Sequence, residues 1–99
     1  MAAYLIANIR VTDPARFAEY REKVAPMIAR YGGRYLIRGG AVTPVEGDPR
    51  LDRVVVLEFP DMAALKRFYH SEDYAPLIAL RQSASTGDVA LVEGYAPPG

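Results

Sequence analysis

The basic residues of one short stretch are the first candidates for chemistry. Arg34 and Arg38 lie in the segment RYGGRYLIRGGAV, residues 30–42. If residues 34–38 form a strand, both side chains lie on one face of the sheet, because alternate residues of a strand share a face. A guanidinium group binds a carboxylate or an enolate through parallel hydrogen bonds. We therefore expect these arginines to face either a bound anion or an acidic residue of the protein.

Glu58 is the acidic residue that the sequence offers for this role. It lies in the expected strand 53–59, which neighbours residues 34–38 in the sheet order proposed below. A cross-strand Arg38–Glu58 pair would satisfy two half-buried charges, and buried charges are normally paired. In the alternative, Arg38 and Glu58 act on a substrate. Both alternatives stay open at this stage.

Arg81 is a third candidate cation. On an expected helix from Tyr74 to about Ser83, Arg81 shares a face with Tyr74 and Ile78. A charged side chain on such an apolar stripe either extends along the surface to reach water or finds a partner inside. In the second case Arg81 reaches over the sheet toward the same pocket as Arg38.

Tyrosine is the favoured aromatic residue, with 7 tyrosines against 3 phenylalanines. Tyrosines on helix stripes pack their rings and direct the hydroxyl to a partner or to water, so several around one cavity would form a small-molecule pocket. We expect the catalytic residues to be Arg38, Glu58 and Tyr69, and the substrate-binding residues to be Tyr20, Arg34, Tyr74 and Arg81.

Other kinds of site find little support. The chain has no cysteine and one histidine, His70, which we expect at the surface, so neither a metal site nor a bound cofactor is expected. No phosphate-binding loop, Ser-His-Asp set or nucleic-acid motif is present. The net charge is zero, which gives no attraction to nucleic acid or to an anionic membrane surface.

The apolar and turn-forming residues predict how these side chains are positioned. Strands are expected at residues 4–11, 34–38, 53–59 and 88–95, and helices at 14–31, 61–69 and 74–83. The order is β-α-β-β-α-β with the second helix split in two, which is the ferredoxin-like α+β arrangement with an antiparallel four-stranded sheet. We expect one domain over residues 1–95 and a frayed tail at 96–99, in a cytoplasmic protein.

Turn and cap residues fix the element ends. Asp13, Asp61 and Ser71 are expected to cap the three helices, because their side-chain oxygens accept hydrogen bonds from free amide groups. The pair Gly32-Gly33 ends the first helix, and Gly39-Gly40 ends the second strand. Pro26 should kink the first helix.

The two faces of the expected sheet differ. One is apolar throughout, and the alternation assigns Tyr35, Ile37, Val55 and Leu57 to it. The other mixes apolar residues with charges, and Arg34, Leu36, Arg38 and Glu58 fall on it. Both faces carry too many large apolar residues to stay in water, so we expect a homodimer in which two sheets pack face to face.

Four blocks carry a family likeness: YGGRYLIRGG (31–40), VVVLEFPD (54–61), FYHSEDYAPLIALR (68–81) and DVALVEG (88–94). In this order they resemble the family called domain of unknown function 1330. The resemblance implies a dimeric α+β barrel of ferredoxin-like protomers, with a pocket in each protomer between sheet and helices. The wider superfamily includes cofactor-independent monooxygenases, but the family itself implies no reaction.

Two functions follow as hypotheses. The first is a cofactor-independent enzyme acting on a small apolar carbonyl- or carboxylate-bearing metabolite. The second is a non-catalytic dimeric module that binds a small molecule or serves a structural purpose.

Overall fold

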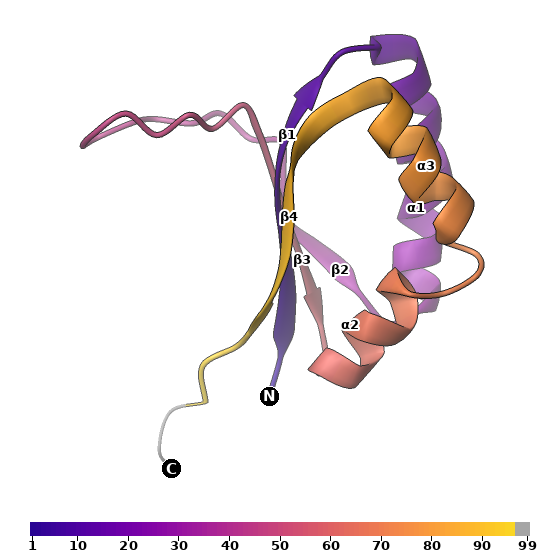
Figure 1. Ribbon diagram of the computed structural model, residues 1–99. Coiled ribbons are helices and arrows are strands. Elements are labelled where there is room, and N and C mark those ends of the chain that lie inside the picture. Colours follow the sequence, from indigo (N-terminus) through magenta and orange to yellow (C-terminus); the bar gives the residue numbers. More distant parts are fainter. Residues whose placement is uncertain (97–99) are drawn as a thin grey trace.

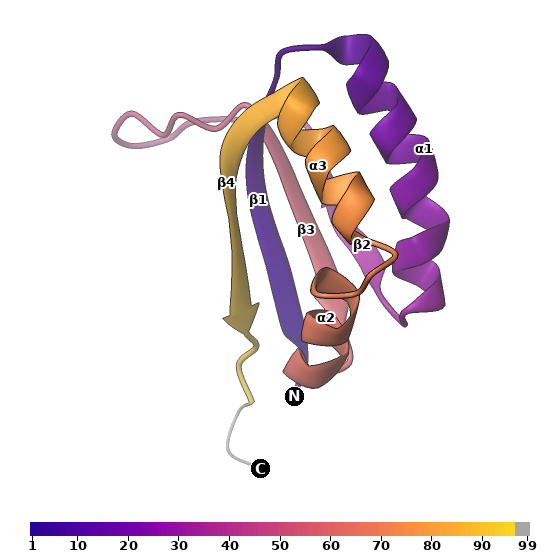
Figure 2. The ribbon, with the colours of Figure 1, turned by 45° about the vertical axis from the view of Figure 1, so that its right-hand side comes forward.

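A computed structural model describes residues 1–96 as a sheet covered by helices on one face (Figures 1 and 2). The elements are β1 (Ala3–Val11), α1 (Pro14–Arg30), β2 (Arg34–Arg38), β3 (Arg53–Phe59), α2 (Met62–Tyr69), α3 (Ala75–Ala84) and β4 (Ser85–Glu93). The strands pair antiparallel in the order β2-β3-β1-β4, which confirms the ferredoxin-like arrangement and the split second helix. Residues 97–99, most of the expected tail, lie outside the described residues.

The predicted caps begin two of the helices. The Asp13 carboxylate accepts the amide of Arg16 at 3.2 Å, and the Asp61 carboxylate accepts the amide of Ala64 at 2.7 Å. Ser71 does not cap α3 directly, because the residue that precedes this helix is Tyr74. The Ser71 hydroxyl accepts the Tyr74 amide at 3.1 Å and so caps the turn that leads into α3.

The first glycine pair ends α1 as predicted. Gly32 has a φ of 87°, a left-handed conformation that glycine adopts without a Cβ clash, and its amide donates to the carbonyl of Ala29 at 3.0 Å. Pro26 lies inside α1, and the helix runs uninterrupted from Pro14 to Arg30.

The last strand begins three residues before the position expected from the sequence. β4 starts at Ser85, immediately after α3, and pairs there with Val11 of β1. The segment Ser85–Gly87 has no apolar alternation, so nothing local marks it as a strand. Its extended backbone results from the ladder with β1, and tertiary pairing of this kind overrides local preference.

The helices cover the face of the sheet that carries Leu5, Ile9, Leu57 and Phe59, all at most 4% exposed. The sequence left open which face this would be. Three rings continue the core under α2 and α3: Phe59 and Phe68 stack with centroids 5.3 Å apart, and Phe68 meets Tyr74 at 4.4 Å.

A β-bulge in β2 corrects the predicted faces of this strand. Tyr35 is paired with Leu57 of β3, whereas Ile37 is paired with Val56, so Leu36 is an extra residue without a partner. One extra residue reverses the alternation. Ile37 therefore lies on the open face, and Arg38, opposite Val55, lies on the helix side, the reverse of the predicted assignment.

The open face of the sheet, opposite the helices, is largely apolar. Ile6, Ile37 and Val92 are 42%, 43% and 42% exposed there. The loop between β2 and β3, residues 39–52, projects away from the sheet on this same side, and we call it the arm (Figure 1). Asn8 holds the base of the arm, because its side-chain amide donates to the Arg50 carbonyl at 2.8 Å and accepts the Asp52 amide at 2.9 Å.

Candidate functional site

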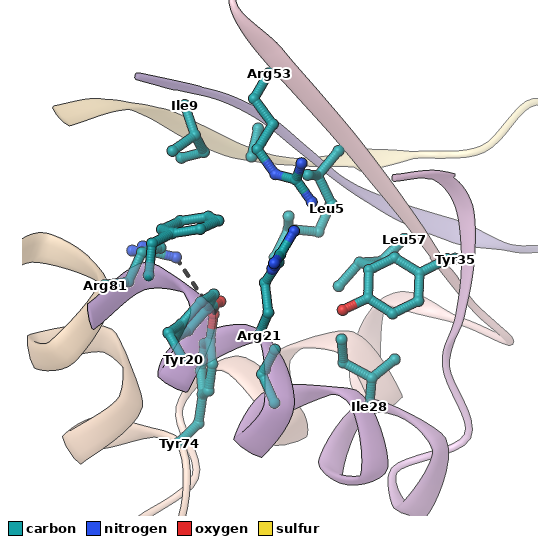
Figure 3. Close-up of a pocket in the computed structure, with 14 residues that line it drawn as sticks. Leu5, Ile9, Tyr20, Arg21, Ile28, Tyr35, Arg53, Leu57, Tyr74 and Arg81 are labelled. Carbon is teal, nitrogen blue, oxygen red and sulfur yellow. Dashed lines mark hydrogen bonds between the residues drawn. The ribbon is translucent and has the colours of Figure 1, made fainter. Parts of the chain in front are cut away.

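A cavity lies between the sheet and helices α1 and α3 (Figure 3). Its walls are mainly apolar side chains of β1, β3 and α1: Leu5, Ala7, Ile9, Phe17, Val24, Ile28, Val55 and Leu57. The space between them is about 40 Å³, room for a few water molecules. A larger guest therefore requires side chains at the cavity mouth to move.

One end of the cavity holds a buried polar cluster formed by Tyr20, Tyr74 and Arg81. The hydroxyls of Tyr20 and Tyr74 lie 2.7 Å apart, and Arg81 Nη1 donates to the Tyr74 hydroxyl at 3.3 Å (Figure 3). Burial, and then the neighbouring Tyr20, raises the pKa of Tyr74, which therefore stays a neutral phenol at physiological pH. The sequence predicted these three residues as binding residues, and the structure brings them together.

Arg81 is buried without an acidic partner. It is 7% exposed, and within residues 1–96 no carboxylate forms an ion pair with it. Burial alone would lower its pKa, but Tyr74 and Tyr69 outweigh that effect and keep the pKa above its ordinary value. Of the two alternatives for this side chain, the structure selects the one in which it reaches into the protein. Because buried charges are normally paired, an unpaired buried guanidinium indicates a place for an anion.

The mouth of the cavity carries further cations. We use "the mouth" for Arg21 of α1, Tyr35 of β2 and Arg53 of β3, which line the cavity, and for Arg38 of β2, which does not line it but lies next to Tyr35 and Arg53. Arg38 lies over the Tyr35 ring at 4.5 Å, and Arg53 Nε is buried with no hydrogen-bond partner within residues 1–96. Burial, followed by the charges of Arg21 and Arg38, lowers the pKa of Arg53. Burial also raises the pKa of Tyr35, although the nearby Arg38 opposes that shift.

The sequence analysis missed Arg21, Tyr35 and Arg53 as site residues. Arg21 was detectable, because it falls on the apolar stripe of α1 with Phe17 and Val24, just as Arg81 falls on the stripe of α3. The other two stand on the cavity face of their strands. Only the pairing of β2 with β3 shows that they meet.

Two predicted site residues lie on the other side of the sheet. Glu58 faces the open side, where Arg34 binds it at 2.7 Å and the Tyr4 hydroxyl donates to it at 3.2 Å. The expected Arg38–Glu58 pair is therefore wrong. Its physical reason is the bulge at Leu36, which turns Arg38 to the helix side and leaves Arg34 opposite Glu58.

Tyr69 lies behind the polar cluster rather than in the cavity wall. Its ring meets that of Tyr74 with centroids 5.6 Å apart, and it contributes to the raised pKa of Arg81. His70 is exposed at the end of α2, as expected. Within residues 1–96 there is no group of three or more histidine or acidic side chains placed to hold a metal ion, and no helix long and apolar enough to cross a membrane.

A ferredoxin-like protomer with a cavity between sheet and helices is the fold of the dimeric α+β barrel proteins. The match to a family model over residues 2–95 then shows that the chain belongs to the family named domain of unknown function 1330. This confirms the resemblance noted in the sequence. No curated protein matches the chain significantly.

Solved structures with this fold are distant in sequence. A protein of unknown function from Rhodopseudomonas palustris, RPA0582, is 18% identical with a TM-score of 0.74, over 97% of this chain and 84% of that one. SnoaB from Streptomyces nogalater, described as a cofactor-independent oxygenase, is 18% identical with a TM-score of 0.62, over 96% and 94% of the two chains. Rv0793 from Mycobacterium tuberculosis is 16% identical with a TM-score of 0.57 over the full length of both. At these identities the likeness shows the fold alone.

Proposed function

We propose that this protein binds a small apolar anion, a carboxylate or an enolate, in the cavity between sheet and helices, and that it acts on this molecule as an enzyme without a cofactor. The observation that carries the proposal is Arg81, a guanidinium that is 7% exposed, lines an apolar cavity and has no carboxylate partner within residues 1–96. A bound anion would supply the missing negative charge.

The surroundings of Arg81 suit the stabilisation of negative charge that develops during a reaction. In an apolar, water-poor site, fixed donors interact with an oxyanion far more strongly than in water. Arg81 supplies the positive charge, and Tyr20 and Tyr74 supply hydroxyl groups that are held in place by one another. In this proposal Tyr20 is the candidate for proton transfer and Arg38 acts at the mouth, whereas Tyr69 lies behind the cavity wall and Glu58 lies on the other face of the sheet, so neither touches the ligand.

A second candidate function is non-catalytic binding. One observation favours it: among the described residues, 1–96, the titratable side chains that line the cavity are arginines and tyrosines, with no carboxylate or imidazole to serve as a strong general base. A substrate acidic enough to enter already ionised would not need such a base. SnoaB, described as a cofactor-independent oxygenase, makes oxygen uptake a reasonable activity to assay here.

Native mass spectrometry, paired with a denatured spectrum of the same sample, tests the binding proposal. We expect an additional small mass that co-purifies with the wild-type protein and is absent from Arg81→Met. Incubating the protein with the identified compound in air then separates the two functions. A product of altered mass supports the enzyme, and an unchanged compound supports the binding module. If wild type and variant carried the same mass, the cavity would not be the binding site.

The open sheet face supports a homodimer as the assembly of this protein. Ile6, Ile37 and Val92 are each more than 40% exposed there, and an apolar sheet face of this kind is normally covered. A second copy packed face to face would cover it with two-fold symmetry. A monomer in the native spectrum would contradict this proposal. The cytoplasmic location stays a prediction from composition, which cell fractionation can test.

A further inference from the structure

The cavity has cations at both of its ends. At one end Arg81 lies with Tyr20 and Tyr74, and toward the other end Arg21 and Arg53 point at one another with Tyr35 beyond them (Figure 3). The Phe17 ring contacts both groups, with its centroid 5.5 Å from the guanidinium carbon of Arg53 and 5.6 Å from the centroid of the Tyr20 ring. The proposed function needs one anion, which Arg81 accounts for, and gives no role to Arg21 and Arg53.

The mouth brings like charges together without an acid. Arg21, Arg38 and Arg53 come from three different elements, α1, β2 and β3, and none of them forms an ion pair within residues 1–96. Several other arginines of this chain do have acidic partners, for example Arg34 and Arg10. The positive charges of the mouth repel one another, so their grouping disfavours the free protein unless an anion joins them.

The backbone just after β2 leaves room for the Arg53 guanidinium at the mouth of the cavity. Gly39, just after β2, has a φ of 70°, and a Cβ at this position would collide with the Arg53 guanidinium. The bulge at Leu36 brings Arg38 to the same side of the sheet. Arg53 Nε is also buried without a hydrogen-bond partner within residues 1–96, so one donor of this group still lacks an acceptor. These features meet at one point, where a second anionic group of the ligand would bind.

We infer that the ligand is a dianion with an apolar middle, such as a small dicarboxylate or a carboxylate that also carries an enolate, bound with one anionic end at Arg81 and the other at the mouth. The inference rests on the proposed function and adds the substrate class to it. Each end binds through charge-assisted hydrogen bonds to guanidinium groups, and the apolar walls contact the carbon chain between them.

Flexible dicarboxylates from succinate to sebacate, each compared with its own monomethyl ester, test the inference. The ester keeps the length of the molecule and loses one charge. We expect the best-fitting diacid to bind about tenfold more tightly than its ester, or better, because a hydrogen bond to a charged group has about that effect on an equilibrium constant. Binding is measured by NMR chemical-shift titration at low ionic strength, because salt weakens exposed charge interactions.

Two arginine variants distinguish the ends of the cavity. Arg21→Gln, at an exposed position of α1, should remove the advantage of the diacid and leave the ester affinity unchanged. Arg81→Gln should weaken the binding of both. Arg67→Gln, an equal charge change at an exposed position of α2 that does not line the cavity, should affect neither and serves as the matched control.

The possible failures are distinct. If diacid and ester bind the wild type equally, or if Arg21→Gln weakens both by the same factor, the second anion site is wrong and the proposed function stands. If no compound of the series binds the wild-type protein, the dianion is overturned, whereas the proposed function is overturned only if wild type and Arg81→Met carry the same mass in the native spectrum. The amide spectrum of each variant establishes that its fold is intact.

Discussion

Replacing Arg81 by methionine tests whether this arginine serves the fold or a guest. Methionine has similar length, carries no charge and fills irregular apolar space. The loss is one charge-assisted hydrogen bond, from Nη1 to the Tyr74 hydroxyl at 3.3 Å, worth about 1.5–3 kcal/mol. The Tyr74 hydroxyl is not left alone, because it keeps Tyr20 at 2.7 Å.

The gain is the relief of a buried charge, because at physiological pH Tyr74 is a neutral phenol that gives Arg81 a hydrogen-bond acceptor but no negative charge. Arg81 is 7% exposed, and removing an ion of this kind from water costs several kcal/mol when no acid balances it. The difference favours the variant. We expect Arg81→Met to increase the free energy of unfolding by about 1–3 kcal/mol, within the range measured when buried ionic groups are replaced by apolar ones. For a domain of this size each kcal/mol corresponds to about 4–8 °C in Tm.

Urea unfolding and thermal unfolding, both at one fixed protein concentration, measure the effect. The fixed concentration matters because a dimer becomes more stable as its concentration rises. Arg67→Met on the exposed side of α2 is the control and should shift the stability by less than about 0.5 kcal/mol. A loss of about 2 kcal/mol or more in Arg81→Met would refute the reasoning, because the guanidinium would then be a structural group of the apo protein.

Three further predictions follow from the same structure. Ile6→Lys on the open face should produce a folded monomer by light scattering, because the lysine charge would be buried in the proposed interface, whereas Ala29→Lys on exposed α1 should leave the assembly unchanged. Because the pKa of Tyr74 is raised in the folded state, its contribution to stability is complete below about pH 10 and falls above that pH by up to about 1.4 kcal/mol per pH unit. Unfolding curves at alkaline pH should show a smaller slope of stability against pH for Tyr74→Phe. An equal slope in both proteins would contradict this prediction. Asn8→Ala should release the arm, residues 39–52, because it removes both hydrogen bonds at the base of the arm. Limited proteolysis should then cut the arm faster than in the wild type, with little change in global stability. An unchanged rate of cutting would show that the two hydrogen bonds of Asn8 do not hold the arm.

The fold was predictable from the sequence because its signals are local and agree with one another. Asp13 and Asp61 stand where helices begin, Gly32 where the first helix ends, and the apolar run 53–59 between turn residues. β4 was placed three residues too late, since its first residues become extended only by pairing with β1. That pairing joins segments far apart in the chain and leaves no local pattern.

The site was predictable where a charge interrupts an apolar stripe. Arg81 stood out on its helix for this reason, and Arg21 carries the same signal on α1. The bulge was the obstacle in β2. Leu36 suits a strand as well as its neighbours do, so no residue type marks it as the extra one, and a strict alternation then places Arg34 and Arg38 together.

The bulge also affects how positions can be transferred between relatives of this protein. In β2 the alternation of faces is shifted by one residue at Leu36. Arg34 and Arg38 are four residues apart and would share a face in a regular strand. Here Arg34 lies on the open face, which is proposed to meet a second copy, and Arg38 lies on the cavity side. A relative that pairs the same five residues as a regular strand, without the bulge, would direct its second arginine toward the open face, even though the residue types matched. Whether an arginine in this strand belongs to the proposed interface or to the cavity therefore depends on how the strand is paired rather than on the identity of the residue.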